Sequence, residues 1–253
     1  MTSRAKASHI ASALSVADIV AVLYGSHMRI YPEDPRNPER DRFVLSKGHA
    51  GTAVYAALAE CGFISLDDLL DNYYKNGSKY SGHVSHVGVA GVEFSTGSLG
   101  HGVCVACGMA LSGKLGKKDY RVFAVVGDGE CDEGSVWETA LLANQYELDN
   151  FTIIVDRNDQ QSFGHCKETA LDLMDLGKKF SSFGWTVFDV NGHDHGEIKE
   201  ALDQSFEGKP KCIVAHTVKG KGVSFMEDEV VWHYRDVQGE QLEQALREVS
   251  GNL

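Results

Sequence analysis

The residues best suited to chemistry in this chain follow two short apolar runs. One run ends at Asp128, which stands between Gly127 and Gly129, and the other ends three residues before Asn158. The two side chains are thirty positions apart (158 − 128), which leaves room for one helix and the next strand of a right-handed βαβ unit. We therefore expect both side-chain oxygens at the carboxyl edge of a parallel sheet, where open α/β sheets bind their ligands.

A carboxylate beside an amide oxygen predicts a site for a hard divalent cation that carries a diphosphate. Mg²⁺, or Ca²⁺, takes such oxygens and shares its remaining positions with phosphate and water. The predicted ligands are Asp128, Asn158 and a main-chain carbonyl at Gln160. Glu133 precedes a predicted helix whose N-terminus can receive phosphate. The alternative interpretation is an ordinary βα turn in which Asp128 only caps a helix.

Strands and helices are predicted to alternate around this pair. The pattern indicates an α/β fold, with a single domain over residues 1–253 and a mostly parallel sheet covered by helices on both faces. The long stretch 77–97 is predicted to be an ordered functional loop. Predicted strands are 43–45, 121–126, 151–155, 185–190 and 211–218, and predicted helices are 8–24, 46–61, 66–74, 98–114, 134–147, 169–183, 196–206 and 238–249.

Charge and the distribution of apolar residues argue against nucleic-acid binding and against a membrane span. The net charge of −12 argues against nucleic acid, whose backbone attracts clusters of Lys and Arg. No run approaches about 20 consecutive apolar residues, so no membrane span is expected. The N-terminus lacks a stretch of signal-peptide type, which predicts a cytoplasmic protein.

Several separated motifs occur in the order found in one enzyme family. The segment from Gly127 to Asn158 resembles the thiamine-diphosphate motif, and the chain resembles the N-terminal, diphosphate-binding domain of transketolases from about residue 5 to 235. The implied fold is the thiamine-diphosphate-binding fold. The other segments that resemble transketolase motifs are 8–9 with 14–19, 41–49, 82–83 with 91–102, and 219–226.

The resemblance implies a function for each matching residue. Asp128, Asn158 and the backbone at Gln160 would bind the metal, and Gly129 would pack against the diphosphate. Histidines would line the substrate channel and serve in catalysis, and one of them, His49, would also contact the cofactor. The implied catalytic histidines are His9, His49, His83 and His233, and the further implied cofactor contacts are Ser98, Leu99, Gly100, Gly127 and Glu133.

The resemblance also implies a partner, because this chain matches only the first domain of the family. A second polypeptide, the C-terminal transketolase subunit, would supply the pyrimidine-binding domain and the glutamate that activates the cofactor. The expected assembly is an α2β2 heterotetramer, unless the chain is a fragment of a longer protein. The implied reaction moves a two-carbon ketol unit from a ketose, or ketose phosphate, donor to an aldose acceptor.

Two alternatives stay open. One is another thiamine-diphosphate enzyme, such as a 2-oxo acid dehydrogenase E1 α-subunit or a deoxyxylulose-phosphate synthase; the histidines and the segment 95–100 favour transketolase. The other is a cofactor-binding module without catalysis, against which the retained Asp128 and Asn158 argue. Split transketolases tend to have Ala-Pro shortly after Trp-His, whereas here Tyr234, Arg235 and Asp236 follow His233, which leaves the position of that histidine open.

Overall fold

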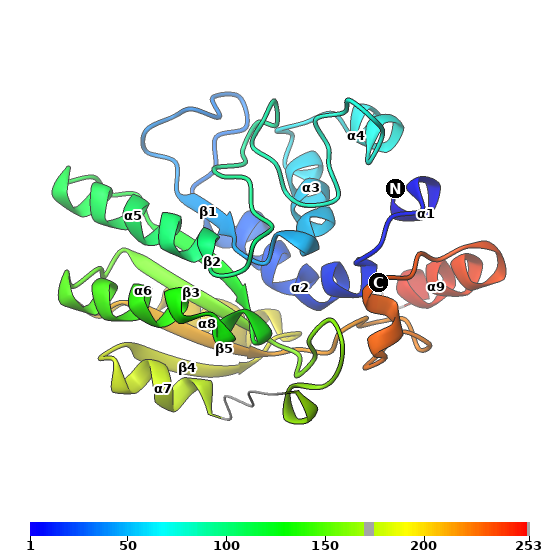
Figure 1. Cartoon of the computed structure of the whole chain (residues 1–253). Helices are drawn as coiled ribbons and strands as arrows, with labels where there is room; N and C mark the ends of the chain where they lie inside the picture. The colour runs from blue at the N-terminus through cyan, green and yellow to red at the C-terminus, as the bar shows by residue number, and fades with distance from the viewer. Residues whose placement is uncertain (170–174, 252–253) are drawn as a thin grey trace.

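The computed structural model describes residues 1–169 and 175–251 (Figure 1). The described residues form one sheet of five strands in the order β1-β2-β3-β5-β4, and every neighbouring pair is parallel. This confirms the predicted α/β architecture. The strands are β1 (Arg42–Leu45), β2 (Val122–Gly127), β3 (Phe151–Arg157), β4 (Thr186–Asn191) and β5 (Lys211–His216).

Side chains of the central strands alternate between two cores. On β2, Phe123 and Val125 belong to one apolar cluster, whereas Ala124 and Val126 belong to another on the opposite face. A parallel strand buried on both faces has an unbroken apolar sequence, which explains the two runs before Asp128 and Asn158. The first core takes α2 (Ile10–Val22), α3 (Gly51–Glu60) and α8 (His195–Asp203), and the second takes α5 (His101–Leu115), α6 (Gly134–Gln145) and α7 (Leu176–Ser182).

A third apolar cluster joins the two ends of the chain. Val223, Met226 and Trp232 pack with Ala11 of α2. The segment that contains His233 is therefore held beside the start of α2. The remaining elements are α1 (Thr2–Ala5), α4 (Leu66–Asn72), α9 (Gly239–Gly251), a π-helical turn (Leu23–His27) and 3₁₀ turns at Gly48–Ala50, Gly129–Asp132, Cys166–Glu168 and Val230–His233.

The predicted elements are present with shifted ends. The helix predicted from residue 8 begins at Ile10, because His9 has a φ of 71° and cannot belong to a right-handed helix. Part of the helix predicted over 169–183 lies outside the described residues, and α7 begins at Leu176. The stretch 77–97 contains neither helix nor strand among its residues, all of which are described.

The stretch Ile10–His27 is long and apolar enough, by length and composition alone, to cross a membrane. However, 56% of it is buried within the protein, and α2 packs against α3 and α8. Its apolar composition is accounted for by this position in the core, on one face of the sheet.

Candidate active site

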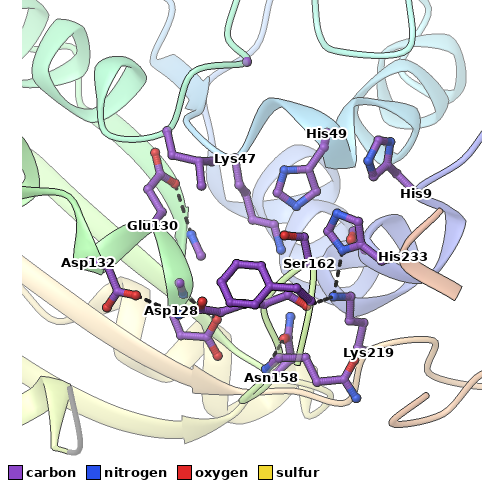
Figure 2. A pocket seen from close by; sticks show the side chains of 18 of the residues that line it. His9, Lys47, His49, Asp128, Glu130, Asp132, Asn158, Ser162, Lys219 and His233 are labelled. Carbon is purple, nitrogen blue, oxygen red and sulfur yellow. Dashed lines mark hydrogen bonds between the residues drawn. The ribbon is translucent and has the colours of Figure 1, made fainter. Parts of the chain in front are cut away.

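Four polar side chains converge because they follow four parallel strands. Lys47 follows β1, Asp128 follows β2, Asn158 follows β3 and Lys219 follows β5. Parallel strands end at the same edge of a sheet, so these residues meet there. They line a cavity of about 550 Å³. In Figure 2 three histidines lie at one end of this cavity, Asp128 and Asn158 lie at the other, and the two lysines extend between them.

The carboxylate of Asp128 is only 5% exposed and is oriented by backbone groups. Its Oδ1 accepts a hydrogen bond from the N–H of Gly129 (2.7 Å), and its Oδ2 accepts one from the N–H of Asp159 (2.6 Å). Burial, followed by repulsion from Asp156, raises the pKa of Asp128 to about 6. A cation beside these oxygens would offset both effects, and each oxygen keeps a lone pair for it.

The loop after β3 contributes Asn158 and Gln160 to the cavity lining. Asp159 has a φ of 59°, and the turn it makes lets the N–H of Gln160 donate to Asn158 Oδ1 (3.1 Å). The side chain of Gln160 donates through Nε2 to Asp228 (2.7 Å), whereas its buried Oε1 has no hydrogen-bond partner in the described protein. A buried acceptor without a donor suits a cation or a cation-bound water.

The donor set fits a hard divalent cation. Asp128, Asn158 and Gln160 all line the cavity and offer oxygen, the element that Mg²⁺ and Ca²⁺ prefer. In residues 1–169 and 175–251 no group of three or more His, Cys, Asp and Glu side chains could hold a metal, so such a cation would take the Asp128 carboxylate and otherwise amide, main-chain and ligand oxygens. A Cβ at Gly129 would lie 2.8 Å from Gln161 Cγ, so the glycine lets Gln161 pack closely against the turn after Asp128.

Two lysines that our sequence analysis missed line the cavity, and one of them, Lys47, forms an ion pair with the buried Asp156. Lys219 is 2% exposed, and its Nζ lies 3.0 Å from His233 Nδ1. Burial, together with the nearby charge of Lys47, lowers the pKa of Lys219 to about 8. A buried ammonium is stabilised by an anionic ligand such as a phosphate. Both lysines could have been identified from their positions in the sequence, since Lys47 stands two residues from His49 and Lys219 lies inside a segment that resembles a transketolase motif.

The four histidines predicted to be catalytic lie together, although they come from separate parts of the chain. The ring centroid of His9 is 4.9 Å from that of His233, 5.5 Å from that of His49 and 5.6 Å from that of His83. All four line the cavity, which answers the question about the position of His233. Tyr234 lies beside His9 and His233 and is 65% exposed.

These histidines are held in the neutral form. Burial, followed by the charges of neighbouring groups, lowers the pKa of His9 to about 4 and that of His233 to about 3. The pKa of His49 is well below its ordinary value, and that of His83 is also lowered, in both cases mainly by burial. A neutral imidazole has one donor and one acceptor nitrogen, so the cluster can bind hydroxyl groups and exchange protons with them.

A buried glutamate that the sequence analysis missed lines the cavity near Asp128, at what we call the acidic end. Glu130 is 1% exposed and accepts hydrogen bonds from the hydroxyl of Ser46, from the N–H of Gly100 (2.8 Å) and from the N–H of Gly127 (3.2 Å). It thereby joins the turn before α5 to the end of β2. Gly100 has a φ of 77°, and a Cβ there would collide with Ser135, so glycine is required.

The predicted cofactor contacts do not all reach the cavity. Gly127, Gly129, Leu99 and Glu133 line it, whereas Ser98 and Gly100 are not among its lining residues. The side chain of Ser98 is exposed, and Gly100 is buried behind the wall. Glu133 is also exposed, at the N-terminus of α6. The exposed ring of Phe163 (74%) lines the cavity as well, and the sequence analysis did not single it out.

Two transketolase subunits are among the known proteins that this chain resembles in sequence. An apulose-4-phosphate transketolase subunit from Phocaeicola vulgatus is 42% identical over 253 residues, covering 99% of this chain and 89% of that protein. The 6-deoxy-6-sulfo-D-fructose transketolase subunit SqwG of Clostridium sp. is 38% identical over 243 residues, covering 95% of this chain and 88% of that protein.

A solved structure matches over the same extent. The crystal structure of transketolase from Campylobacter jejuni superposes with a TM-score of 0.92 at 32% identity, covering 98% of this chain but only 40% of the solved one. Residues 1–251 match the family described as transketolase, thiamine diphosphate binding domain. The chain therefore belongs to the transketolase family and corresponds to its thiamine-diphosphate-binding domain.

Proposed function

We propose that this chain is one subunit of a two-component, thiamine-diphosphate-dependent transketolase. The enzyme would transfer a two-carbon ketol unit from a ketose, or ketose phosphate, to an aldose. The observation that carries the proposal is that one cavity combines the side-chain oxygens of Asp128 and Asn158 with two lysines and four histidines. Diphosphate anchoring and handling of sugar hydroxyls need these groups at opposite ends of an elongated cofactor.

At the acidic end, Asp128, Asn158 and Gln160 would hold Mg²⁺ or Ca²⁺ against the diphosphate. Lys219 would add a positive charge beside the same phosphates, and Gly129 would allow their close approach. These groups position the cofactor and exclude water from its charged part. When bound, thiamine diphosphate supplies the nucleophilic carbon that accepts the two-carbon unit.

At the other end, the histidines would bind the hydroxyl groups of the sugar. Neutral His233 accepts from the Lys219 ammonium at Nδ1, so its Nε2–H is the donor for a sugar hydroxyl, whereas neutral His9 has one donor and one acceptor nitrogen. Their proximity to His49 and His83 lets a proton leave or reach a substrate hydroxyl without passing through bulk water.

A partner subunit is part of the proposal. The carboxylates that line the cavity, at positions 128, 130, 132 and 133, all come from the segment after β2, so the described residues bring none to the histidine end. We propose that a subunit with the pyrimidine-binding domain supplies one there, in an α2β2 heterotetramer. Relatives named as subunits of two transketolases support the two-component organisation.

The test is reconstitution. The purified chain would be combined with candidate pyrimidine-domain subunits, and ketol transfer would be followed with hydroxypyruvate and a panel of ketose donors. We expect transfer only when both polypeptides, thiamine diphosphate and Mg²⁺ are present. Turnover of 2-oxo acids without ketol transfer would point instead to another class of thiamine-diphosphate enzyme. Robust transfer by the chain alone would refute the two-component proposal.

A further inference from the structure

Asp156 lies behind the cavity wall and holds one of the proposed cation ligands. It is fully buried and is not among the lining residues. The amide nitrogen Nδ2 of Asn158 donates to Asp156 Oδ2 (3.1 Å) and to Ser15 Oγ (3.1 Å). An ionised carboxylate can only accept hydrogen bonds, so the amide must turn its NH₂ group toward Asp156.

Asp156 accepts hydrogen bonds from two hydroxyls, which also lie 3.1 Å from each other. The hydroxyls of Ser15 (2.7 Å) and Thr217 both donate to Asp156 Oδ1, and Lys47 forms an ion pair with Oδ2. Ser15 has a single hydroxyl hydrogen, which is used on Asp156, so its lone pair is available to Asn158. Both groups that face the amide nitrogen therefore act as acceptors, which excludes the flipped amide.

The oxygen of the Asn158 amide also has a hydrogen-bond partner. Asn158 Oδ1 accepts the N–H of Gln160, within the loop that contributes to the cation site. With its nitrogen held by Asp156 and Ser15, the amide presents oxygen and never nitrogen to this loop. A flipped amide would turn two N–H bonds toward a cation and remove one of its ligands.

We propose that Asp156 is a positioning residue that fixes the Asn158 amide so that Oδ1 faces a divalent cation, with Ser15 as its second anchor. The inference rests on the proposed function, since it concerns the same cation site. Asp156 is on β3, Ser15 is on α2 and Lys47 follows β1, so three elements of the core determine the orientation of one ligand. Groups that orient metal ligands typically change metal affinity by about 10–100-fold when they are removed.

The test uses Mn²⁺ as the probe. The full chain would be titrated with Mn²⁺, alone and with thiamine diphosphate, and unbound Mn²⁺ would be read from its electron paramagnetic resonance signal. We expect Asp156→Asn to weaken Mn²⁺ binding by about tenfold or more, because an amide at 156 can donate as well as accept. Affinity within twofold of the wild-type value would overturn the inference.

A matched pair of variants covers the case in which Asp156→Asn does not fold. Ser15→Ala and Thr217→Val each remove one hydroxyl donor from Asp156, but only Ser15 contacts the Asn158 amide. We expect Ser15→Ala to weaken Mn²⁺ binding by about threefold or more, and Thr217→Val to leave it within twofold. Equal effects of the two changes would count against the inference. Thermal unfolding of each variant reports whether it is folded.

A further variant separates this inference from the proposed function. Asp128→Ala removes the proposed cation ligand itself and should abolish Mn²⁺ binding. If Asp128→Ala binds Mn²⁺ normally, or the wild-type chain does not bind it, the proposed site is wrong and the inference fails with it. If Asp128→Ala loses binding while Asp156→Asn keeps it, the site stands and only the positioning by Asp156 is refuted.

Discussion

The backbone N–H of His9 donates to the carbonyl oxygen of His233 at 3.1 Å, and the two rings lie 4.9 Å apart. His9 directly precedes α2 and His233 ends the 3₁₀ turn Val230–His233, so this bond joins the N-terminal and C-terminal parts of the fold. The left-handed backbone at His9 and the apolar packing of Trp232 on Ala11 hold the pair in place. The histidine end of the cavity therefore exists only when the whole chain has folded.

The first prediction concerns the cation ligand with the strongest support. Asp128→Ala should abolish metal-dependent binding of thiamine diphosphate, because it removes the one carboxylate among the three proposed ligands. Isothermal titration calorimetry with thiamine diphosphate, with and without Mg²⁺, measures the effect. Asp67→Ala, which removes an exposed carboxylate from the first turn of α4, should bind as the wild type does. Full affinity and activity in Asp128→Ala would show that the site has been assigned wrongly.

Lys219 is expected to bind the diphosphate. Lys219→Gln should weaken thiamine diphosphate binding by about tenfold to a hundredfold, since a hydrogen bond to a charged group is worth roughly 1.5–3 kcal/mol. Lys221→Gln is a matched control, because Lys221 is two residues away and forms an exposed ion pair with Glu227 (3.5 Å). Quenching of tryptophan fluorescence by the cofactor provides the readout. Equal losses in the two variants would indicate a general charge effect.

The lowered pKa values of the histidines predict an acid-dependent loss of stability. Their folded pKa values, about 4 for His9 and about 3 for His233, lie below the unfolded value of about 6.5. The stability that they contribute is therefore fully present above pH of about 6.5 and is lost as the pH falls toward the folded values. In this pH window each histidine can lower the free energy of unfolding by up to about 1.4 kcal/mol for every pH unit of acidification.

The variant His233→Gln cannot titrate and should make this dependence shallower. The free energies of unfolding of wild type and variant would be measured by urea denaturation between pH 4.5 and 7.5, in steps of roughly one pH unit. A matched control is His216→Gln, because His216 is exposed and lies outside the cluster. If His233→Gln and the wild type lose stability in parallel as the pH falls, the neutral state of His233 is not the cause.

Glu130 is predicted to be structural. Glu130→Ala leaves the hydroxyl of Ser46 and the N–H groups of Gly100 and Gly127 without their acceptor inside the protein. The free energy of unfolding should fall by at least about 3 kcal/mol, since each of the three unsatisfied buried donors costs about 1–3 kcal/mol. Glu133→Ala, at an exposed position three residues later, should change it by less than about 0.5 kcal/mol. Urea denaturation measures both, and similar values for the two would contradict the assignment.

The sequence by itself determined the fold class and the meeting of Asp128 and Asn158, the proposed cation ligands, at one edge of the sheet. Apolar runs that end at Asp128 and Asn158 indicate parallel strands, and parallel strands bring their carboxyl ends to one edge whatever the detailed packing. The four histidines were also found from the sequence, although through their resemblance to family motifs. The local sequence does not predict that His9 lies beside His233, because the two residues are 224 positions apart (233 − 9) and contacts at such a separation depend on the whole fold.

Only the tertiary structure decided how the site is charged and oriented. The burial of Lys219 and Glu130, and the hydrogen bonds from Asn158 to Asp156 and Ser15, depend on elements far apart in the chain. A pattern of residue types contains no information on which face of an amide meets a carboxylate. Burial and long-range packing also set the pKa values of the histidines. The sequence therefore determined which residues reach the sheet edge, whereas the packed structure decided what each of them can bind there.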